Sequence, residues 1–189
     1  MEAKDIGYFK LFRDVCKSIN SSLNLKEVFV LITENVIKVL NVKACTIFLL
    51  DRASKRLEVS TFSGLSDAYI KKGPVDADKS IAESLEGKAV LVYDAPSDSR
   101  TQYPKEAKRE GIASILSVPI TVKGTIIGVL RIYTSQPRNF SDDEIEFVSG
   151  LADMGGIAID NARMHDYLKK DHENLINEVH RWFEYGQTP

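Results

Sequence analysis

Cysteine is scarce in this sequence, and so is histidine. Cys16 and Cys45 are the two cysteines in 189 residues, which is too few for a disulfide framework or for a cysteine-based zinc site. The three histidines, His165, His172 and His180, are separated by seven and eight residues, too far to share one metal ion along a single helix. The sequence therefore predicts no metal site, and the histidines are interpreted as solvent-facing or interface residues.

Long apolar runs and a large excess of one charge are also absent. The formal net charge is −2, so no basic face for nucleic acid is expected. The most apolar stretch, residues 28–50, is interrupted by Glu34, Lys38 and Lys43, and no membrane-spanning helix is expected. Residues 1–5 contain two acidic side chains and do not resemble a signal peptide. These features predict a cytoplasmic protein.

Recognisable catalytic patterns are missing as well. Gly124 and Gly128 belong to a predicted hairpin and Gly155-Gly156 to a predicted helix, so none of them forms a phosphate-binding loop. No nucleophile with an adjacent base can be proposed from the spacing. The sequence predicts a protein with no catalytic activity of its own.

A β-hairpin is the clearest structural pattern that is present. Residues 112–122 and 125–134 are both rich in β-branched and apolar residues, which favours two strands in the middle of a sheet. Lys123-Gly124 between them fits a two-residue turn, because Gly tolerates the positive φ that such turns need.

Helices and further strands are expected on both sides of this hairpin. Apolar residues at helical spacing from Tyr8 to Ile19 predict a first helix, and a capping box of Asn24 and Glu27 begins a second one that ends near Leu40. Strands are expected at 44–50, 57–62 and 89–93, and shorter helices at 67–72, 80–87 and 104–111. A last helix begins at a capping box in residues 141–144 and has no clear stop before Gly186, a length of about 65 Å.

The order of these elements resembles the GAF domain family. The segments that carry the resemblance are residues 44–51 (ACTIFLLD), 80–92 (SIAESLEGKAVLV), 117–120 (SVPI), 127–130 (IGVL), 140–144 (FSDDE) and 158–163 (AIDNAR). Each motif is weak alone, but all of them occur in order. The resemblance implies an α+β fold, with a central antiparallel sheet, helices on one face and a crossover region with a ligand pocket on the other. It divides the chain into an N-terminal helix (1–22), a GAF domain (23–166) and an extension of the last helix (167–189).

The resemblance implies a sensory or regulatory module that binds a small molecule on the open face of the sheet. By motif position, the candidate pocket residues are Thr46, Phe48, Phe62, Ser63, Ile81, Ala82, Ser114 and Tyr133. Tyr103 and the loop from Asp94 to Arg100 are expected at the rim, and Arg131 is added as a charge within an apolar strand. The same large side chains could instead fill a closed core. Arg131 interrupts an apolar strand, and it must reach water, a carboxylate or an anionic ligand. The loop with Asp94, Asp98 and Arg100 is either part of a site or a solvated turn.

The identity of the ligand stays open, although three subgroups of the family are disfavoured. Cyclic nucleotide binders carry an Asn-Lys pair where this chain has Thr134-Ser135. Bilin binders need a cysteine near the helix before the hairpin, and none is present there. Methionine sulfoxide reductases of this fold need several cysteines around the pocket, whereas Cys16 lies in the first helix and Cys45 in a strand.

The two terminal helices are expected to form a homodimer. In the first helix the candidate contacts are Phe12, Val15 and Ile19, and in the last helix they are Met164, Leu168, Leu175 and Trp182. Polar residues at other positions of the same stripe argue against a long, strict zipper. The alternative is that both helices pack only on their own domain. Because no output domain is recognised in the sequence, a separate signalling partner is expected, and a ligand-free dimeric scaffold is the alternative function.

Overall fold

The computed structural model describes residues 3–21, 24–77 and 82–185. Helices α1 (Ala3–Ser21) and α2 (Leu25–Leu40) precede strands β1 (Ala44–Asp51) and β2 (Arg56–Ser63). A crossover of short elements follows: α3 (Asp67–Ile70), β3 (Val75–Asp76), the 3-10 helix η1 (Ala82–Glu86), β4 (Val90–Val92) and α5 (Pro104–Glu110). The chain ends with β5 (Ser114–Val122), β6 (Thr125–Thr134) and α6 (Asp142–Tyr185).

The strands form one antiparallel sheet in the order β3-β2-β1-β6-β5-β4. The predicted hairpin of β5 and β6 lies inside this sheet, with β6 paired to β1 and β5 paired to the edge strand β4. Lys123 (φ 48°) and Gly124 (φ 75°) both adopt left-handed conformations, as a type I′ turn requires. In the resulting register Ser117 lies directly opposite Arg131. The predicted fold class and hairpin are therefore confirmed.

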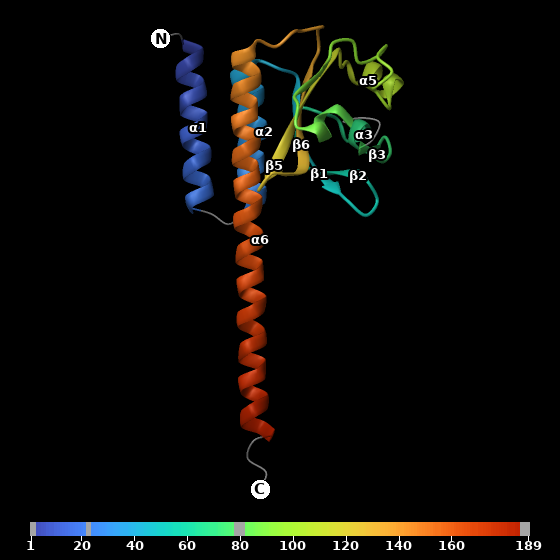
Figure 1. Cartoon of the computed structure of the whole chain (residues 1–189). Helices are drawn as coiled ribbons and strands as arrows, with labels where there is room; N and C mark the ends of the chain where they lie inside the picture. Colours follow the sequence, from blue (N-terminus) through green and yellow to red (C-terminus); the bar gives the residue numbers. More distant parts are fainter. Residues whose placement is uncertain (1–2, 22–23, 78–81, 186–189) are drawn as a thin grey trace.

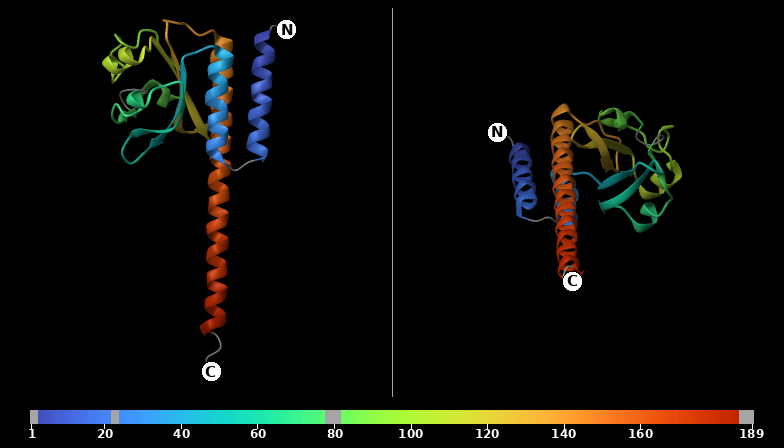
Figure 2. Two further views of the ribbon diagram at one scale, coloured as in Figure 1. Left: turned by 180° about the vertical axis from the view of Figure 1, so that it is seen from behind. Right: turned by 60° about the horizontal axis from the view of Figure 1, so that its bottom comes forward.

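Helices α2 and α6 cover one face of the sheet, and α1 packs on the outer side of these two helices. Figures 1 and 2 show this arrangement, with the short crossover elements on the other face of the sheet. The main core lies between the sheet and these helices. It contains Phe29 and Ile32 of α2, Leu116 of β5, Ile132 of β6 and Leu151 of α6. Because side chains alternate between the two faces along each strand, the strand residues next to those in the main core point to the crossover face.

Two glycines of α6 allow other elements to approach this helix closely. A Cβ on Gly156 would overlap the backbone carbonyl oxygen of Thr121 in β5, so α6 can lie against the sheet only without a side chain at this position. A Cβ on Gly150 would lie 2.7 Å from Cζ of Phe12 in α1. The Phe12 ring also packs edge-on against Phe147, with 5.3 Å between the ring centroids. The close approaches at Gly150 and Gly156 set where α1 and β5 meet the last helix.

Only the first part of α6 touches the sheet. The helix has 44 residues, a length of about 66 Å at 1.5 Å per residue, and Figure 1 shows it extending far beyond the domain. In this projecting part Met164, Leu168 and Leu175 are each at least half exposed. In the described part of the chain, no helix has the combination of length and apolarity needed to cross a membrane.

The crossover differs from the sequence-based expectation in three places. Strand β3 was not predicted, because two residues carry no periodic pattern. The helix expected at 80–87 is the 3-10 helix η1, and its first two expected residues, Ser80 and Ile81, lie outside the described residues. The helix expected at 67–72 ends at Ile70. The other predicted helices and strands are present within a few residues of their expected bounds.

Candidate functional site

A small cavity lies on the crossover face of the sheet. Its floor is formed by the central strands, where Arg131 of β6 is only 6% exposed. The Arg131 Nε donates a hydrogen bond to the Ser117 hydroxyl at 3.0 Å. Its guanidinium carbon lies 5.6 Å from the centroid of the Phe48 ring in β1. The arginine side chain thus contacts both strands next to β6.

One wall of the cavity carries an amine between two aromatic rings. Tyr69 is on α3, and Lys72 lies two residues beyond the end of this short helix. The Lys72 ammonium lies 3.9 Å from the Tyr69 ring centroid and 5.8 Å from that of Tyr103. Its nitrogen also donates a hydrogen bond to the Tyr69 carbonyl oxygen at 3.1 Å. Among the described residues, no carboxylate forms an ion pair with Lys72.

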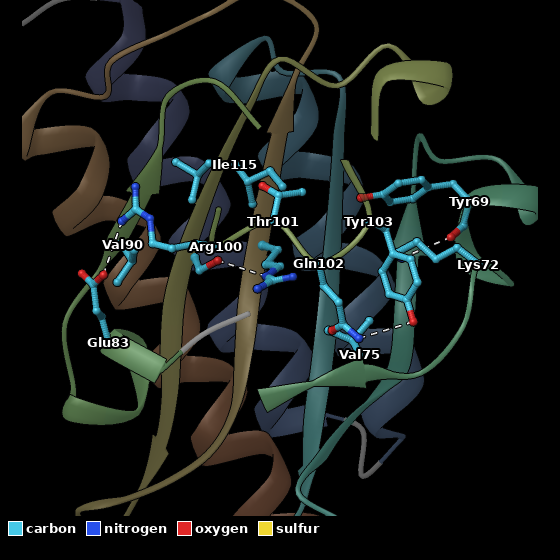
Figure 3. A pocket seen from close by; sticks show the side chains of 13 residues that line it. Tyr69, Lys72, Val75, Glu83, Val90, Arg100, Thr101, Gln102, Tyr103 and Ile115 are labelled. Atoms are coloured by element: carbon cyan, nitrogen blue, oxygen red, sulfur yellow. Dashed lines mark hydrogen bonds and ion pairs between the residues drawn. The ribbon is translucent and has the colours of Figure 1, made fainter. Parts of the chain in front are cut away.

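The opposite wall contains a cation that is neutralised by carboxylates. Arg100 makes a two-point contact with Asp98, with Nη2–Oδ2 at 2.7 Å and Nε–Oδ1 at 3.0 Å, and lies 3.4 Å from Glu83 of η1. The hydrogen bond with Arg100 lowers the pKa of Asp98, and the same bond raises the pKa of Arg100. Figure 3 shows Arg100 and Glu83 on one side of the cavity and Tyr69, Lys72 and Tyr103 on the other.

Two consecutive side chains tie the loop before α5 to the strand β3 region. Gln102 accepts a hydrogen bond from the Asp76 amide at 2.8 Å and donates one to the Pro74 carbonyl at 3.1 Å. The Tyr103 hydroxyl donates to the same carbonyl at 2.7 Å. Gly73 (φ 134°) must lack a side chain, because a Cβ would lie 2.6 Å from this hydroxyl. These bonds close the cavity on the side of β3.

The cavity encloses about 70 Å³, roughly the volume that two water molecules occupy in the liquid. Its lining combines apolar side chains, three cations, one carboxylate and several hydroxyls. The residues are Tyr69, Lys72, Val75, Glu83, Val90, Val92, Arg100, Thr101, Gln102, Tyr103, Ile115, Ser117 and Arg131. Apolar walls with a few convergent polar groups are typical of small-molecule sites.

Burial shifts the titration of several groups at the cavity. Burial, and after it the positive charge of Arg131, lowers the pKa of Lys72 to about 8, against the opposing influence of Glu110 and Glu106 on α5. Burial also raises the pKa of Tyr69 and of Tyr133. Two cationic side chains in one small cavity therefore repel each other in the ligand-free protein.

We expect Lys72→Met to stabilise the free protein near neutral pH. The folded-state pKa of Lys72 lies below its ordinary value of 10.5, so the unfolded chain binds the proton more tightly. Below about pH 8 the cost of this buried charge is fully present, and it disappears as the pH rises toward 10.5. Thermal unfolding at pH 7, 8 and 9.5 should show a higher Tm for Lys72→Met than for wild type at pH 7, and a shrinking difference above pH 8.

Lys71→Met is the matched control for this prediction. Lys71 is exposed and adjacent in sequence, and its replacement should change Tm little at every pH. A Lys72→Met variant with a Tm advantage independent of pH would contradict the charge argument, because it would leave only the apolar contacts of the new methionine.

The structure brings some of the sequence-predicted site residues together. Tyr103 and Arg131 line the cavity. Phe48 lies beneath Arg131, and Tyr133 packs edge-on against Tyr69, with 6.2 Å between the centroids. Thr46 is buried and interacts with Tyr133. These five residues share the crossover face, although the last three support the lining rather than form it.

Other predicted site residues lie elsewhere. Ser63 is on the helix face, where its hydroxyl hydrogen bonds to Thr33 of α2 at 3.1 Å, because it pairs in register with Cys45, which faces the main core. Phe62 lies opposite Thr46 on the crossover face but is not among the lining residues. The Asp94 side chain is exposed, and its carbonyl oxygen accepts the amides of Ser97 and Asp98 in a turn.

The remaining predicted site residues are Ser114, Ile81 and Ala82. Ser114 is fully buried and serves a structural purpose: its hydroxyl donates to the Tyr93 carbonyl at 2.6 Å and accepts the Arg138 amide at 3.0 Å. Ile81 lies outside the described residues, as does the side chain of Ala82.

Sequence reasoning missed most of the lining. The missed residues are Tyr69, Lys72, Val75, Glu83, Val90, Val92, Thr101, Gln102, Ile115 and Ser117. The hairpin register could have revealed Ser117 and Ile115, since they share a face with Arg131 and Tyr133 by strand alternation. No comparable local pattern marks Tyr69 and Lys72, which come from the crossover.

The residues of the first helix that were predicted as dimer contacts pack within their own chain. Val15 is completely buried, and Phe12 and Ile19 are half-buried against the main core. Met164, Leu168 and Leu175 of α6 are exposed, whereas nothing is described of the Trp182 side chain. In the structure α1 therefore packs on its own domain, and an exposed apolar stripe lies on α6.

Neither cysteine lies at the cavity. Cys45 is buried in the main core on the helix face of β1, and burial raises its pKa far above the usual range. Cys16 is exposed on α1. The cavity therefore has no cysteine thiol that could act as a nucleophile.

Comparison with known proteins places this geometry in a family. A family model described as GAF domain matches residues 22–160. A methyl sulfide methyltransferase-associated sensor of Methanosarcina acetivorans is 29% identical over 172 residues, covering 87% of this chain. The chain spans only 17% of the length of that relative.

Solved structures show the same fold at lower identity. The GAF domain of a phosphoenolpyruvate-protein phosphotransferase from Coxiella burnetii superposes with a TM-score of 0.75, at 20% identity, over 88% of this chain and 99% of that one. A free methionine-R-sulfoxide reductase from Neisseria meningitidis, in complex with its substrate, gives a TM-score of 0.72 at 14% identity, over 87% and 95% of the two chains. With the family model covering most of the chain, this protein belongs to the GAF domain family.

Proposed function

We propose that this protein is a sensor that binds a small molecule in the crossover-face cavity and passes the binding event to a partner protein through α6. Membership of the GAF family and the sensor-named relative support a sensory or regulatory domain. The observation that carries the proposal is the cavity itself, in which Lys72 and Arg131 face apolar walls. The absence of a cysteine from its lining argues against sulfoxide reduction, despite the shared fold.

A chain of partly buried polar contacts connects the cavity side of the sheet with the beginning of α6. Ser114, at the start of β5, joins Tyr93 after β4 to the Arg138 amide. The Arg138 guanidinium donates to the Leu40 carbonyl at the end of α2 (2.8 Å) and pairs with Glu144 of α6 (2.7 Å). A shift of the loop after β4 on ligand binding would therefore be felt at the start of α6.

The projecting part of α6 is the proposed contact between two copies of the chain. Ile157, Met164, Leu168 and Leu175 follow each other at spacings of seven, four and seven residues and are 50–58% exposed. Such spacing is that of a coiled-coil seam. A single helix with an exposed apolar stripe is marginal in water, and pairing with a second copy would bury the stripe.

We expect Leu168→Glu/Leu175→Glu to convert a dimer into a monomer. The new carboxylates of one copy would be placed in the seam against the second copy, where burying an unpaired charge is costly. Sedimentation velocity over a tenfold range of protein concentration measures the change. Lys169→Gln/Lys170→Gln is the control, because it changes the net charge by the same amount off the stripe. The proposed dimer would be contradicted if the wild type is a monomer at all concentrations, or if both variants associate equally.

Native mass spectrometry of protein purified from cells, followed by denaturing identification of released molecules, tests the sensor function. The expected result is a discrete adduct on wild type that Val90→Phe lacks. Val90 is half-buried and lines the cavity, so a phenyl ring there fills the space with little strain elsewhere. An adduct that persists in Val90→Phe would place the ligand outside the cavity. A wild type that binds nothing, with or without added small molecules, would favour the ligand-free scaffold.

A further inference from the structure

We propose that Lys72 captures a small aldehyde, of about two or three carbon atoms, as a Schiff base in the crossover-face cavity. This inference rests on the proposed function, because it names the chemical class that the same cavity would take and the bond that would hold it. It follows from the surroundings of the amine, the size of the cavity and the groups that share its lining.

The amine of Lys72 lines the cavity without a carboxylate beside it. Lys72 is half-buried, its nitrogen contacts the rings of Tyr69 and Tyr103, and it donates to the Tyr69 carbonyl oxygen. Within the part of the chain that the structure describes, no ion pair involves this nitrogen. Burial raises the pKa of Tyr69, so its hydroxyl stays neutral and supplies no countercharge. Such surroundings penalise the ammonium and favour the neutral amine.

The protonation of Lys72 supports a nucleophilic role. Its pKa is lowered to about 8, with burial as the largest cause, so about a tenth of the amine is neutral at pH 7. At the ordinary value of 10.5 the neutral fraction would be several hundredfold smaller. The neutral amine is the form that attacks a carbonyl carbon, and lysines desolvated in apolar pockets are known to form Schiff bases with carbonyl compounds.

The size of the cavity limits the ligand and the strength of noncovalent binding. Its volume of about 70 Å³ is roughly half that of a cavity that holds benzene, so it takes about three heavy atoms. Three heavy atoms bind noncovalently with a dissociation constant on the order of 1 mM at best. A covalent bond to Lys72 removes this limit. Because condensation expels the carbonyl oxygen as water, only the carbon atoms of the aldehyde have to stay in the cavity.

The reaction balances without an oxidant or a reductant. The lone pair of the neutral amine forms a bond to the carbonyl carbon, and the C=O π electrons move to the oxygen. Both amine hydrogens then leave with that oxygen as water, and a C=N bond remains. The buried Thr101 hydroxyl lines the same cavity and has no hydrogen-bond partner among the described residues. It offers a hydrogen bond to the oxygen before the water leaves.

The apolar part of the lining accepts the alkyl group. Val92 and Ile115 line the cavity and belong to the same buried apolar cluster as Tyr69, whose ring contacts Lys72. These side chains present only hydrocarbon to a bound molecule, and they keep water away from the C=N bond. Exclusion of water protects a reactive intermediate from hydrolysis.

Borohydride trapping followed by peptide mapping tests the inference on the full chain. The protein is equilibrated near neutral pH with about 0.1 mM acetaldehyde, below the noncovalent limit, and a pulse of borohydride then converts imines into ethylamines. We expect at least tenfold more ethylation of Lys72 than of Lys71, the exposed neighbour that serves as the internal control. The preference should disappear when the protein is unfolded in urea before the aldehyde is added.

A series of aldehydes separates a cavity site from a merely reactive lysine. Propanal should modify Lys72 with a similar preference over Lys71, whereas benzaldehyde, with about twice the heavy atoms that the cavity takes, should show none. In Lys72→Met no other lysine should exceed the ethylation of Lys71. Equal modification of Lys71 and Lys72 by acetaldehyde, or the same preference with benzaldehyde, would overturn the inference.

The remaining outcomes distinguish this inference from the function on which it rests. If Lys72 captures no aldehyde but the protein from cells carries a different adduct, the aldehyde is overturned and the small-molecule sensor stands. If Lys72 captures no aldehyde and the protein carries no adduct, the proposed function fails as well.

Discussion

Gly156→Ala should lower the free energy of unfolding by about 3 kcal/mol, at the upper end of what overpacking usually costs. The new methyl group would overlap the Thr121 carbonyl oxygen, and both groups belong to backbones of regular elements that cannot rotate away. Helix α6 must then move off β5, and the contacts of Leu151 and Ile159 with the sheet are lost as well. Urea unfolding followed by circular dichroism measures the change.

Gly155→Ala is the control for this prediction, because it changes helix propensity in the same way as Gly156→Ala. A Cβ on Gly155 would meet only Phe29 at 3.8 Å and Ile32 at 4.0 Å, which are ordinary contacts. Because alanine is favoured over glycine inside a helix by about 1 kcal/mol, Gly155→Ala should stabilise the protein. Equal effects of the two substitutions would show that α6 does not rest on β5 at Gly156.

Glu144→Ala should destabilise the protein by about 2–3 kcal/mol, somewhat less than a fully buried ion pair because Arg138 keeps some solvent contact. The Glu144 side chain is 7% exposed and that of Arg138 is 26% exposed. The carboxylate pairs with Arg138 and also accepts the Ser141 amide at 3.2 Å in the capping box of α6. Its removal leaves a partly buried guanidinium and a helix end with one bond fewer.

A double-mutant cycle with Arg138→Met shows how much of this cost belongs to the pair. We expect the double variant to be less destabilised than the sum of the single ones, since removing both charges leaves neither uncompensated. Glu146→Ala, at an exposed position two residues further along the helix, should change stability by less than about 0.5 kcal/mol. Additive single effects would argue that Arg138 and Glu144 act independently.

The fold could be predicted from sequence because its main features are local. The Lys123-Gly124 turn and the Asn24 cap of α2 depend on neighbours within a few residues, and both are present as expected. The cavity depends on which distant segments the sheet brings together. Lys72, Arg100 and Ser117 meet only because the strand order places β4 and β3 at opposite edges with the crossover between them.

Ser63 illustrates how the face of a strand residue escapes sequence analysis. Its placement follows from the pairing of Ser63 with Cys45, in a ladder whose register shifts between Ile47 and Phe48. A shift of one residue moves a side chain to the other face, and nothing in the sequence of β2 marks the irregularity. Val15 was expected at a dimer interface but is buried within its own chain for a similar reason. An amphipathic stripe indicates that a face is buried but not which partner covers it.

The length of α6 has a mechanical consequence. The helix is held against the sheet near Gly156 and projects about 44 Å beyond that point to Tyr185. As a stiff lever clamped at one end, it would convert a tilt of about 5° at the sheet into a displacement of about 4 Å at its tip. A side-chain adjustment around a ligand in the small cavity would thus reach a distant partner as a movement comparable with the 5.4 Å pitch of a helix.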